Sequence, residues 1–270
     1  MAMADPTGDP FVLRAASGQA ALRPSPYGPT NVWSYNGSVP GPEIRVRQGD
    51  RVLVLAQNGL DEGTTIHWHG IRTPNAMDGV PFLTQDPIPV DGDFLYEFDA
   101  LDAGTFWYHP HQRSSEQVGR GLYGPLIVEE VDPIRVDRDL TWMLDDWRMT
   151  RAGQLSDDFD NRHDAMHGGR IGNSVTINGQ MPERISVRSG ERIRLRLINA
   201  ANARIFALDF GDHAPRIIAL DARTGRQCRD FGRNGQVRIT DGMGQVRPGY
   251  VSINSPPTIV RGGIVTGHQV

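Results

Sequence analysis

The chain has 270 residues and a mass of 29.8 kDa, enough for one large domain or for two smaller ones that each bury a core. Hydrophobic residues make up 38% of the chain, and they form no uninterrupted run of about 18 residues. This argues against a membrane-spanning helix. The formal net charge of −4 argues against a nucleic-acid partner held by overall basicity.

Short β-rich runs separated by turn residues fill the first half of the chain. They cover residues 51–58, 64–70, 94–100, 104–111 and 124–130. Turn-forming dipeptides such as Pro40-Gly41 and Asp91-Gly92 lie between the runs, at the spacing typical of an antiparallel sandwich or barrel. No long stretch keeps a 3.6-residue apolar period, which disfavours a βαβ fold. The pattern predicts an all-β protein.

A second set of β-rich runs begins after Pro133 and is interrupted by a polar loop at 151–172. These runs cover residues 138–147, 173–180, 183–190, 191–200, 203–210 and 215–221. Residues 181–199 resemble residues 41–58, since each segment reads as a strand, a glycine turn and a second strand. This internal similarity predicts two copies of one sandwich, in residues 1–133 and 134–221.

Four of the eight histidines form two H-x-H pairs, His67 with His69 and His109 with His111. Side chains two apart on a strand point to the same face, so each pair presents two imidazoles about 6–7 Å apart. If the two strands are neighbours, four neutral nitrogen donors converge, and such a set favours copper or zinc. A single H-x-H pair arises readily by chance. Two pairs beside aromatic residues indicate a metal site.

The segments around these pairs resemble the N-terminal domain of multicopper oxidases, the laccase-like enzymes. They read NVWSYNGSVPGPEIRVRQGD, TTIHWHGIRTPNAMDGVP and AGTFWYHPHQRSSEQVGRGLYGPLIVEE. Residues from about 138 to 221 resemble the middle cupredoxin domain of the same family. The resemblance implies two consecutive cupredoxin-like Greek-key β-sandwiches, the second of them incomplete if its last strands are lost. It also implies a trinuclear copper cluster that reduces O2 to water and receives electrons from a separate mononuclear copper.

Matching the motifs assigns the copper-ligand positions of the family to individual residues of this sequence. The resemblance implies that His67 binds the type 2 copper and that three histidines bind the type 3 pair: His69, His109 and His111. Asp78, in NAMDGVP, matches an acidic residue that lies near the cluster in the family and relays the protons that O2 reduction consumes. An ordinary Asp-Gly turn is an equal alternative for Asp78.

The remaining residues do not complete such a centre. In the family, the last domain supplies four more histidines and an H-C-H run, but no H-C-H occurs here and Cys228 has no histidine neighbour. His163 and His167, four apart in NRHDAMHGG, either share a helix face as a weak metal pair or are solvated loop residues. Glu116 is a second proton-relay candidate or a loop cap. We therefore expect half of a trinuclear site, and no copper ligand from residues 138–221.

The tail, residues 222–270, differs in composition from the rest of the chain. It contains no leucine, whereas residues 1–221 contain 17, and it carries seven arginines against two acidic residues. One hypothesis is that a shift of reading frame near residue 221 replaced the family sequence. The alternative is a divergent end of the second sandwich, because GQVRIT, GYVSIN and TIVRGGIV retain a β-like pattern.

The leading functional hypothesis is a laccase-like oxidase that couples oxidation of phenolic or aromatic substrates, or of metal ions, to reduction of O2 to water. The alternative is a non-catalytic copper-binding protein, because half a cluster without the mononuclear copper has no efficient electron entry. A zinc hydrolase is disfavoured by the lack of βα alternation.

The expected partners are copper ions, O2 and a small aromatic or metal-ion substrate, with a homo-oligomer as a further expectation. No nucleic-acid partner and no membrane span are expected. The resemblance implies a periplasmic or secreted location, although MAMADPTGDP lacks the charged and apolar regions of a signal peptide.

Overall fold

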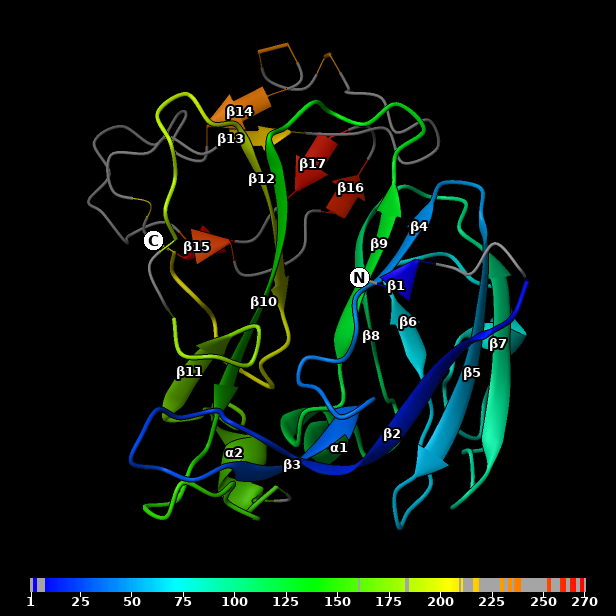
Figure 1. Ribbon diagram of the computed structural model, residues 1–270, viewed down its shortest axis with the longest axis vertical. Coiled ribbons are helices and arrows are strands. Elements are labelled where there is room, and N and C mark those ends of the chain that lie inside the picture. Colours follow the sequence, from blue (N-terminus) through cyan, green and yellow to red (C-terminus); the bar gives the residue numbers. More distant parts are fainter. Residues whose placement is uncertain are drawn as a thin grey trace. The chain divides into compact units, whose positions relative to one another are not determined.

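The computed structural model describes most of the first 210 residues and short pieces beyond them (Figure 1). The described residues are 2–3, 8–159, 161–182, 185–208, 210, 216–218, 229–230, 233–234, 236–238, 252–253, 258–260, 263–265 and 268–269. The chain divides into two compact units, residues 1–204 with 222–225, and residues 205–221 with 226–270. The candidate site lies within the first unit.

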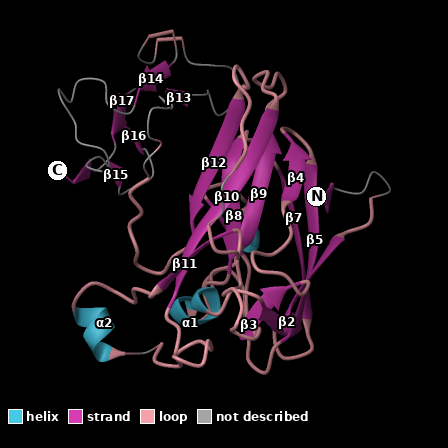
Figure 2. Ribbon diagram, turned by 60° about the vertical axis from the view of Figure 1, so that its left-hand side comes forward, coloured by secondary structure: helices cyan, strands magenta, loops and turns pink. Residues whose placement is uncertain are grey.

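The described residues form mostly strands, as Figure 2 shows. In the first unit these are β1 (Ala2–Met3), β2 (Phe11–Ala20), β3 (Thr30–Tyr35), β4 (Ile44–Arg47), β5 (Arg51–Gly59), β6 (His67–His69), β7 (Asp93–Asp99), β8 (Gly104–His109), β9 (Gly124–Glu129), β10 (Arg138–Trp147), β11 (Ser174–Ile177) and β12 (Ile193–Asn199). The helices are η1 (Asn75–Met77), α1 (Ser114–Gly119) and α2 (Arg162–Met166). The all-β prediction is confirmed, and each of the five runs expected in the first half contains a strand.

The described residues of the second unit form six short strands that pair two by two. They are β13 (Arg216–Ile218) with β14 (Gln236–Arg238), β15 (Ser252–Ile253) with β18 (His268–Gln269), and β16 (Thr258–Val260) with β17 (Gly263–Val265). Cys228, which has no histidine neighbour in the sequence, lies outside the described residues. Among the described residues of the chain, no helix is long and apolar enough to cross a membrane.

Two sheets form the sandwich in the first part of the chain. One has the strand order β1-β4-β9-β8-β6 and the other β3-β2-β5-β7. In β5, Val52, Val54 and Ala56 are buried and alternate with more exposed residues, as expected for a strand with one face on a core. Every residue of β9 except Glu129 is buried, which fits its place between β4 and β8.

Aromatic residues fill the core on the inner side of the strand that carries the first histidine pair. The Trp68 side chain is fully buried, and its ring lies 5.2–6.0 Å, between centroids, from the rings of Tyr96, Phe98 and Tyr108. Burying a tryptophan of about 150–250 Å² contributes roughly 4–6 kcal/mol. Because Trp68 points into the core, the residues on either side of it must point to the opposite face of the sheet.

The strands of the second part pack against the first sandwich. The sheet β11-β10-β12 joins β10 and β12 in parallel. A second hydrophobic cluster contains residues of both parts, among them Leu22, Val118 and Tyr123 with Met143 and Trp147. Strands expected within 183–190 and 203–210 are not formed: the described residues 185–190 and 203–208 are coil or turn, because they pair with no ladder in the described part of the chain.

The internal repeat is visible in two turns of the same construction. Gly49, before β5, and Gly190, before β12, both have positive φ, 93° and 80°. The acidic residue after each glycine, Asp50 or Glu191, accepts a hydrogen bond from the backbone N–H three residues earlier, at 2.8 and 2.9 Å. The segment preceding the second turn is coil, so the repeat is retained in the turn and the second strand.

Candidate metal centre

Antiparallel pairing of β6 with β8 brings the two histidine motifs together. In this register His67 lies opposite His109, and His69 lies opposite Trp107. Cross-strand partners share a face, so both histidines of β6 point to the same side as His109. β8 ends at His109, and the chain then turns through Pro110 to His111.

The four imidazole rings converge in one place. The centroids of His67 and His111 are 4.2 Å apart, and those of His109 and His111 are 5.2 Å apart. His69 lies 5.4 Å from His109 and 5.7 Å from His67, again between centroids. Among the described residues, His67, His109 and His111 each offer a ligand atom, and these atoms lie within 4.8 Å of one another. The expected convergence is therefore present in the geometry.

Backbone carbonyls orient two of the rings. The Nδ1 atom of His67 donates to the carbonyl oxygen of Asp78 at 2.7 Å, and Nδ1 of His109 lies 3.1 Å from the carbonyl of Pro110. A ring that donates from Nδ1 keeps its lone pair on Nε2, where a metal ion can accept it. His111 is held through its backbone N–H, which donates to the hydroxyl of Thr65 at 3.2 Å.

A close backbone approach places the Asp78 carbonyl. Gly79 has φ of +73°, and a Cβ atom added there would lie 1.9 Å from the carbonyl oxygen of Ile66. Only glycine fits between this turn and the strand that leads into β6. The Asp-Gly pair, ambiguous in the sequence, is therefore a turn whose carbonyl contacts His67.

The rings are in an environment that favours their neutral form. Burial is the main cause that lowers the pKa of His109, to about 3, with smaller contributions from the neighbouring imidazoles. Burial and the proximity of His67 also lower the pKa values of His69 and His111. These three imidazoles are neutral at pH 7, as metal ligation requires.

The two acidic candidates occupy different positions. The carboxylate Oδ1 atom of Asp78 lies 3.3 Å from Nδ1 of His67, and the side chain is 36% exposed. Glu116 lies on α1 with its carboxylate between the guanidinium groups of Arg113 and Arg120. Glu116 thus holds α1 in an ion-pair network, whereas Asp78 is next to the imidazoles.

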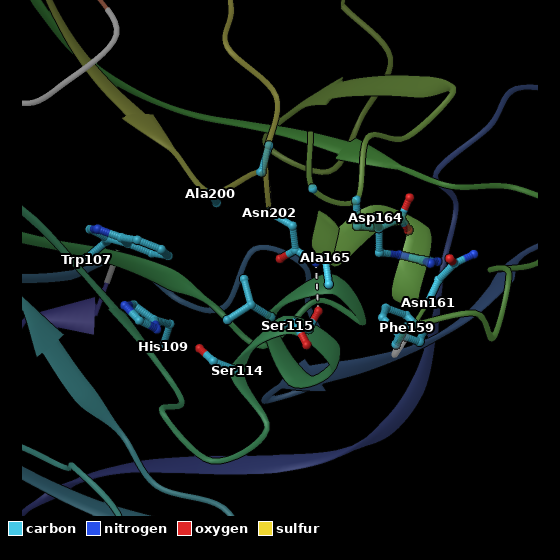
Figure 3. Close-up of a pocket in the computed structure, with 14 residues that line it drawn as sticks. Trp107, His109, Ser114, Ser115, Phe159, Asn161, Asp164, Ala165, Ala200 and Asn202 are labelled. Atoms are coloured by element: carbon cyan, nitrogen blue, oxygen red, sulfur yellow. Dashed lines mark hydrogen bonds between the residues drawn. The ribbon is translucent and has the colours of Figure 1, made fainter. Parts of the chain in front are cut away.

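Sequence reasoning missed the indole that covers one side of the site. The ring of Trp107 stacks on His109, with centroids 4.1 Å apart, and lies 5.1 Å from His69. Its position opposite His69 in the β-ladder follows from the register, which the sequence alone does not fix. Trp107 and His109 also form one wall of a cavity of about 580 Å³ (Figure 3).

The donor set and its spacing suit a transition metal. Nδ1 of His69 and Nε2 of His109 are 3.2 Å apart. Two nitrogens bound to one ion at about 2.0–2.1 Å, with an angle near that of a tetrahedron, are separated by roughly 3.2–3.4 Å. The residues present therefore fit a metal ion held by imidazole nitrogens, and copper heads the affinity order for such donors.

Comparison with known proteins places this arrangement in a family. The family model described as "Multicopper oxidase" matches residues 18–132. A second model, the β-propeller domain of glucose, ethanol and alcohol dehydrogenases, matches residues 182–270. Copper resistance protein A of Pseudomonas syringae pv. tomato is 31% identical over 233 residues, which cover 70% of this chain and 38% of that protein. The chain thus spans less than half the length of this relative.

Solved structures show the same likeness. A multicopper oxidase from Pseudomonas thermotolerans is 38% identical with a TM-score of 0.74, and the match covers 85% of this chain and 55% of that one. The blue copper oxidase of Nitrosomonas europaea is 31% identical with a TM-score of 0.67, and the match covers 88% of this chain and 72% of that one.

Proposed function

Because the chain belongs to the multicopper oxidase family, we propose that its four convergent imidazoles bind copper as one half of an oxidase centre. His67 takes the type 2 position, and three histidines take the type 3 positions: His69, His109 and His111. The observation that carries the proposal is the cross-strand register that sets His67 opposite His109. The 3.2 Å separation between the nitrogens of His69 and His109 supports it further.

Copper bound there supplies one-electron redox chemistry and the capacity to reduce dioxygen. The protein's part is to hold the imidazoles neutral and oriented, through the carbonyls of Asp78 and Pro110 and through burial. Trp107 covers one side of the rings and keeps water from that face of His109. We assign Asp78 to proton delivery, because its half-exposed carboxylate can exchange protons with solvent beside His67.

In the assembled centre, we propose oxidation of phenolic or aromatic compounds, or of metal ions, coupled to reduction of O2 to water. The 270 residues contain no H-C-H run, so on this proposal they form the part of the centre that binds copper through imidazole alone. We propose that the remaining ligands come from outside these 270 residues, and a homo-oligomer is one source. We further propose a periplasmic or secreted location, in line with the copper resistance relatives.

The domain division is part of the same proposal. We place one cupredoxin-like domain in residues 1–133 and a second in 134–221, followed by an atypical tail in 222–270. The two alike turns at Gly49 and Gly190 support a duplicated unit. The change of composition after residue 221 supports a tail of different origin.

The amount of copper that the purified chain retains tests the proposal. We expect wild-type protein to retain copper after passage over a chelating resin and His109→Ala to retain much less. No absorbance near 600 nm and negligible phenol oxidation are expected. Equal retention by wild type and His109→Ala would contradict the proposal. Steady phenol turnover that His109→Ala abolishes would show that a partner completes the centre.

A further inference from the structure

The described part of the chain contains a second pair of neighbouring imidazoles, His163 on α2 and His167 directly after its last residue. His163 and His167 lie four residues apart, and their rings stack with centroids 4.2 Å apart and planes 13° apart. Both residues are exposed. Two histidines at i and i+4 on one face of a helix are a recurrent metal-chelating arrangement, since both rings reach the same point above the helix.

The opposite face of α2 is turned inward. Asn161, Asp164 and Ala165 line the 580 Å³ cavity whose far wall includes His109 (Figure 3). Neither His163 nor His167 is among the residues that line this cavity, and both side chains are exposed. The pair is therefore accessible from solvent and separate from the four-imidazole centre.

The helix is fixed although it has only five residues. Asn161 caps it by accepting a hydrogen bond from the backbone N–H of His163 at 2.8 Å. The Asp164 carboxylate receives two hydrogen bonds from Arg148, at 2.6 and 2.9 Å. A helix this short is not stable alone, so these anchors are what keep the two histidines on one face.

A hydrogen bond also selects the tautomer of one ring. Nδ1 of His167 lies 2.9 Å from the carbonyl oxygen of His163, which can only accept, so Nδ1 carries the proton. The lone pair of His167 is then on Nε2, at the outer edge of the ring. Fixing the tautomer through the second nitrogen is how proteins prepare a histidine for metal ligation.

We propose that His163 and His167 form a surface site for a divalent transition-metal ion, with Cu²⁺ the preferred occupant. Two imidazoles within reach of each other are donors for which copper leads the affinity order. This site departs from the expectation that residues 138–221 hold no copper ligand. The stacked rings do not yet direct their lone pairs at one point, but both are exposed and can turn out of the stack to bind one ion. The site is independent of whether the centre on β6 and β8 binds copper.

Titration with Cu²⁺ alone, followed by NMR of the histidine-labelled full chain, tests this proposal. We expect the ring signals of His163 and His167 to broaden together at one copper concentration. Either His163→Ala or His167→Ala should weaken this event by about tenfold or more, a loss of about 1.4 kcal/mol per factor of ten. Met166→Leu, on the same exposed turn, is the matched control and should leave the event unchanged.

Two results would overturn the site. One is the absence of broadening at both rings when copper is in excess over protein. The other is an unchanged event at the remaining ring after either histidine is replaced, which would show that each imidazole binds copper alone. A parallel titration of His109→Ala keeps the two questions apart, because it should leave the broadening at His163 and His167 intact.

Discussion

Replacing Gly79 by alanine should damage both the fold and the copper centre. The added Cβ would lie 1.9 Å from the carbonyl oxygen of Ile66, where ordinary contact begins at 3.4 Å. The turn must therefore move by about 1.5 Å, away from β6, because the contacted oxygen is the backbone carbonyl of Ile66 and cannot change rotamer to make room. That movement breaks the hydrogen bond from His67 to the Asp78 carbonyl.

The magnitude follows from three contributions. Alanine at a positive φ costs about 1–2 kcal/mol, and the lost hydrogen bond costs about 1 kcal/mol more. With the backbone displacement, the expected loss is about 3 kcal/mol or more, a fall in Tm of roughly 6–12 °C. Loss of the partner that orients His67 should also weaken copper binding about 10–100-fold.

Gly37→Ala is the matched control. Gly37 has φ of +76°, close to that of Gly79, but an added Cβ meets nothing within 4 Å. It should cost only the backbone contribution, about 1–2 kcal/mol, and leave copper binding unchanged. Urea unfolding of the metal-free proteins and copper titration of the folded ones measure both quantities. Equal stability losses in the two variants, with copper binding intact in both, would refute the reasoning.

Three further predictions concern the supports of the site and the packing of the second sheet. Thr65→Val should destabilise the fold by about 1–3 kcal/mol and weaken copper binding, because the His111 N–H loses its acceptor, whereas Thr65→Ser should retain both in the same titrations. Arg196→Met should cost about 3 kcal/mol in urea unfolding, since it removes a buried guanidinium that donates to Asp139 and Thr105 and leaves Asp139 with Arg45 at 3.7 Å. Arg51→Met at an exposed pair should cost less than about 1 kcal/mol, and equal losses would contradict this. Burial raises the pKa of Asp139, but the hydrogen bond from Arg196 and the positive charges of the nearby arginines outweigh burial and lower it. This carboxylate therefore stabilises the fold above about pH 4, and the stabilisation is lost on acidification. Asp139→Asn should flatten the fall in unfolding free energy below that pH.

The sequence predicted the chemistry of the site better than its surroundings. The alternation around Trp68 was enough to place His67 and His69 on one face, because the strand period is fixed by backbone geometry. Convergence of the four imidazoles was predicted on the assumption that the two histidine strands are neighbours, and β6 does pair with β8 in the structure. The contact of Trp107 with His69 depends on the register of that pairing and could not be read from the motif alone.

The second part of the chain was harder to predict for a physical reason. The pattern around 185–190 alternates like that of β4, yet the described residues there are coil, because a strand needs a partner ladder that sequence pattern does not supply. Arg194 and Arg196 interrupt the apolar pattern of β12, and the structure shows that they pair with Glu130 and Asp139. Such long-range ion pairs join residues far apart in sequence.

An anomalous-scattering map at the copper edge, from crystals of the copper-loaded chain, shows directly whether the four imidazoles bind copper. We expect copper density among the nitrogens of His67, His69, His109 and His111, with Nε2 of His109 and Nδ1 of His69 directed at the same ion. Copper-loaded crystals with no anomalous density within bonding distance, about 2 Å, of these nitrogens would contradict it.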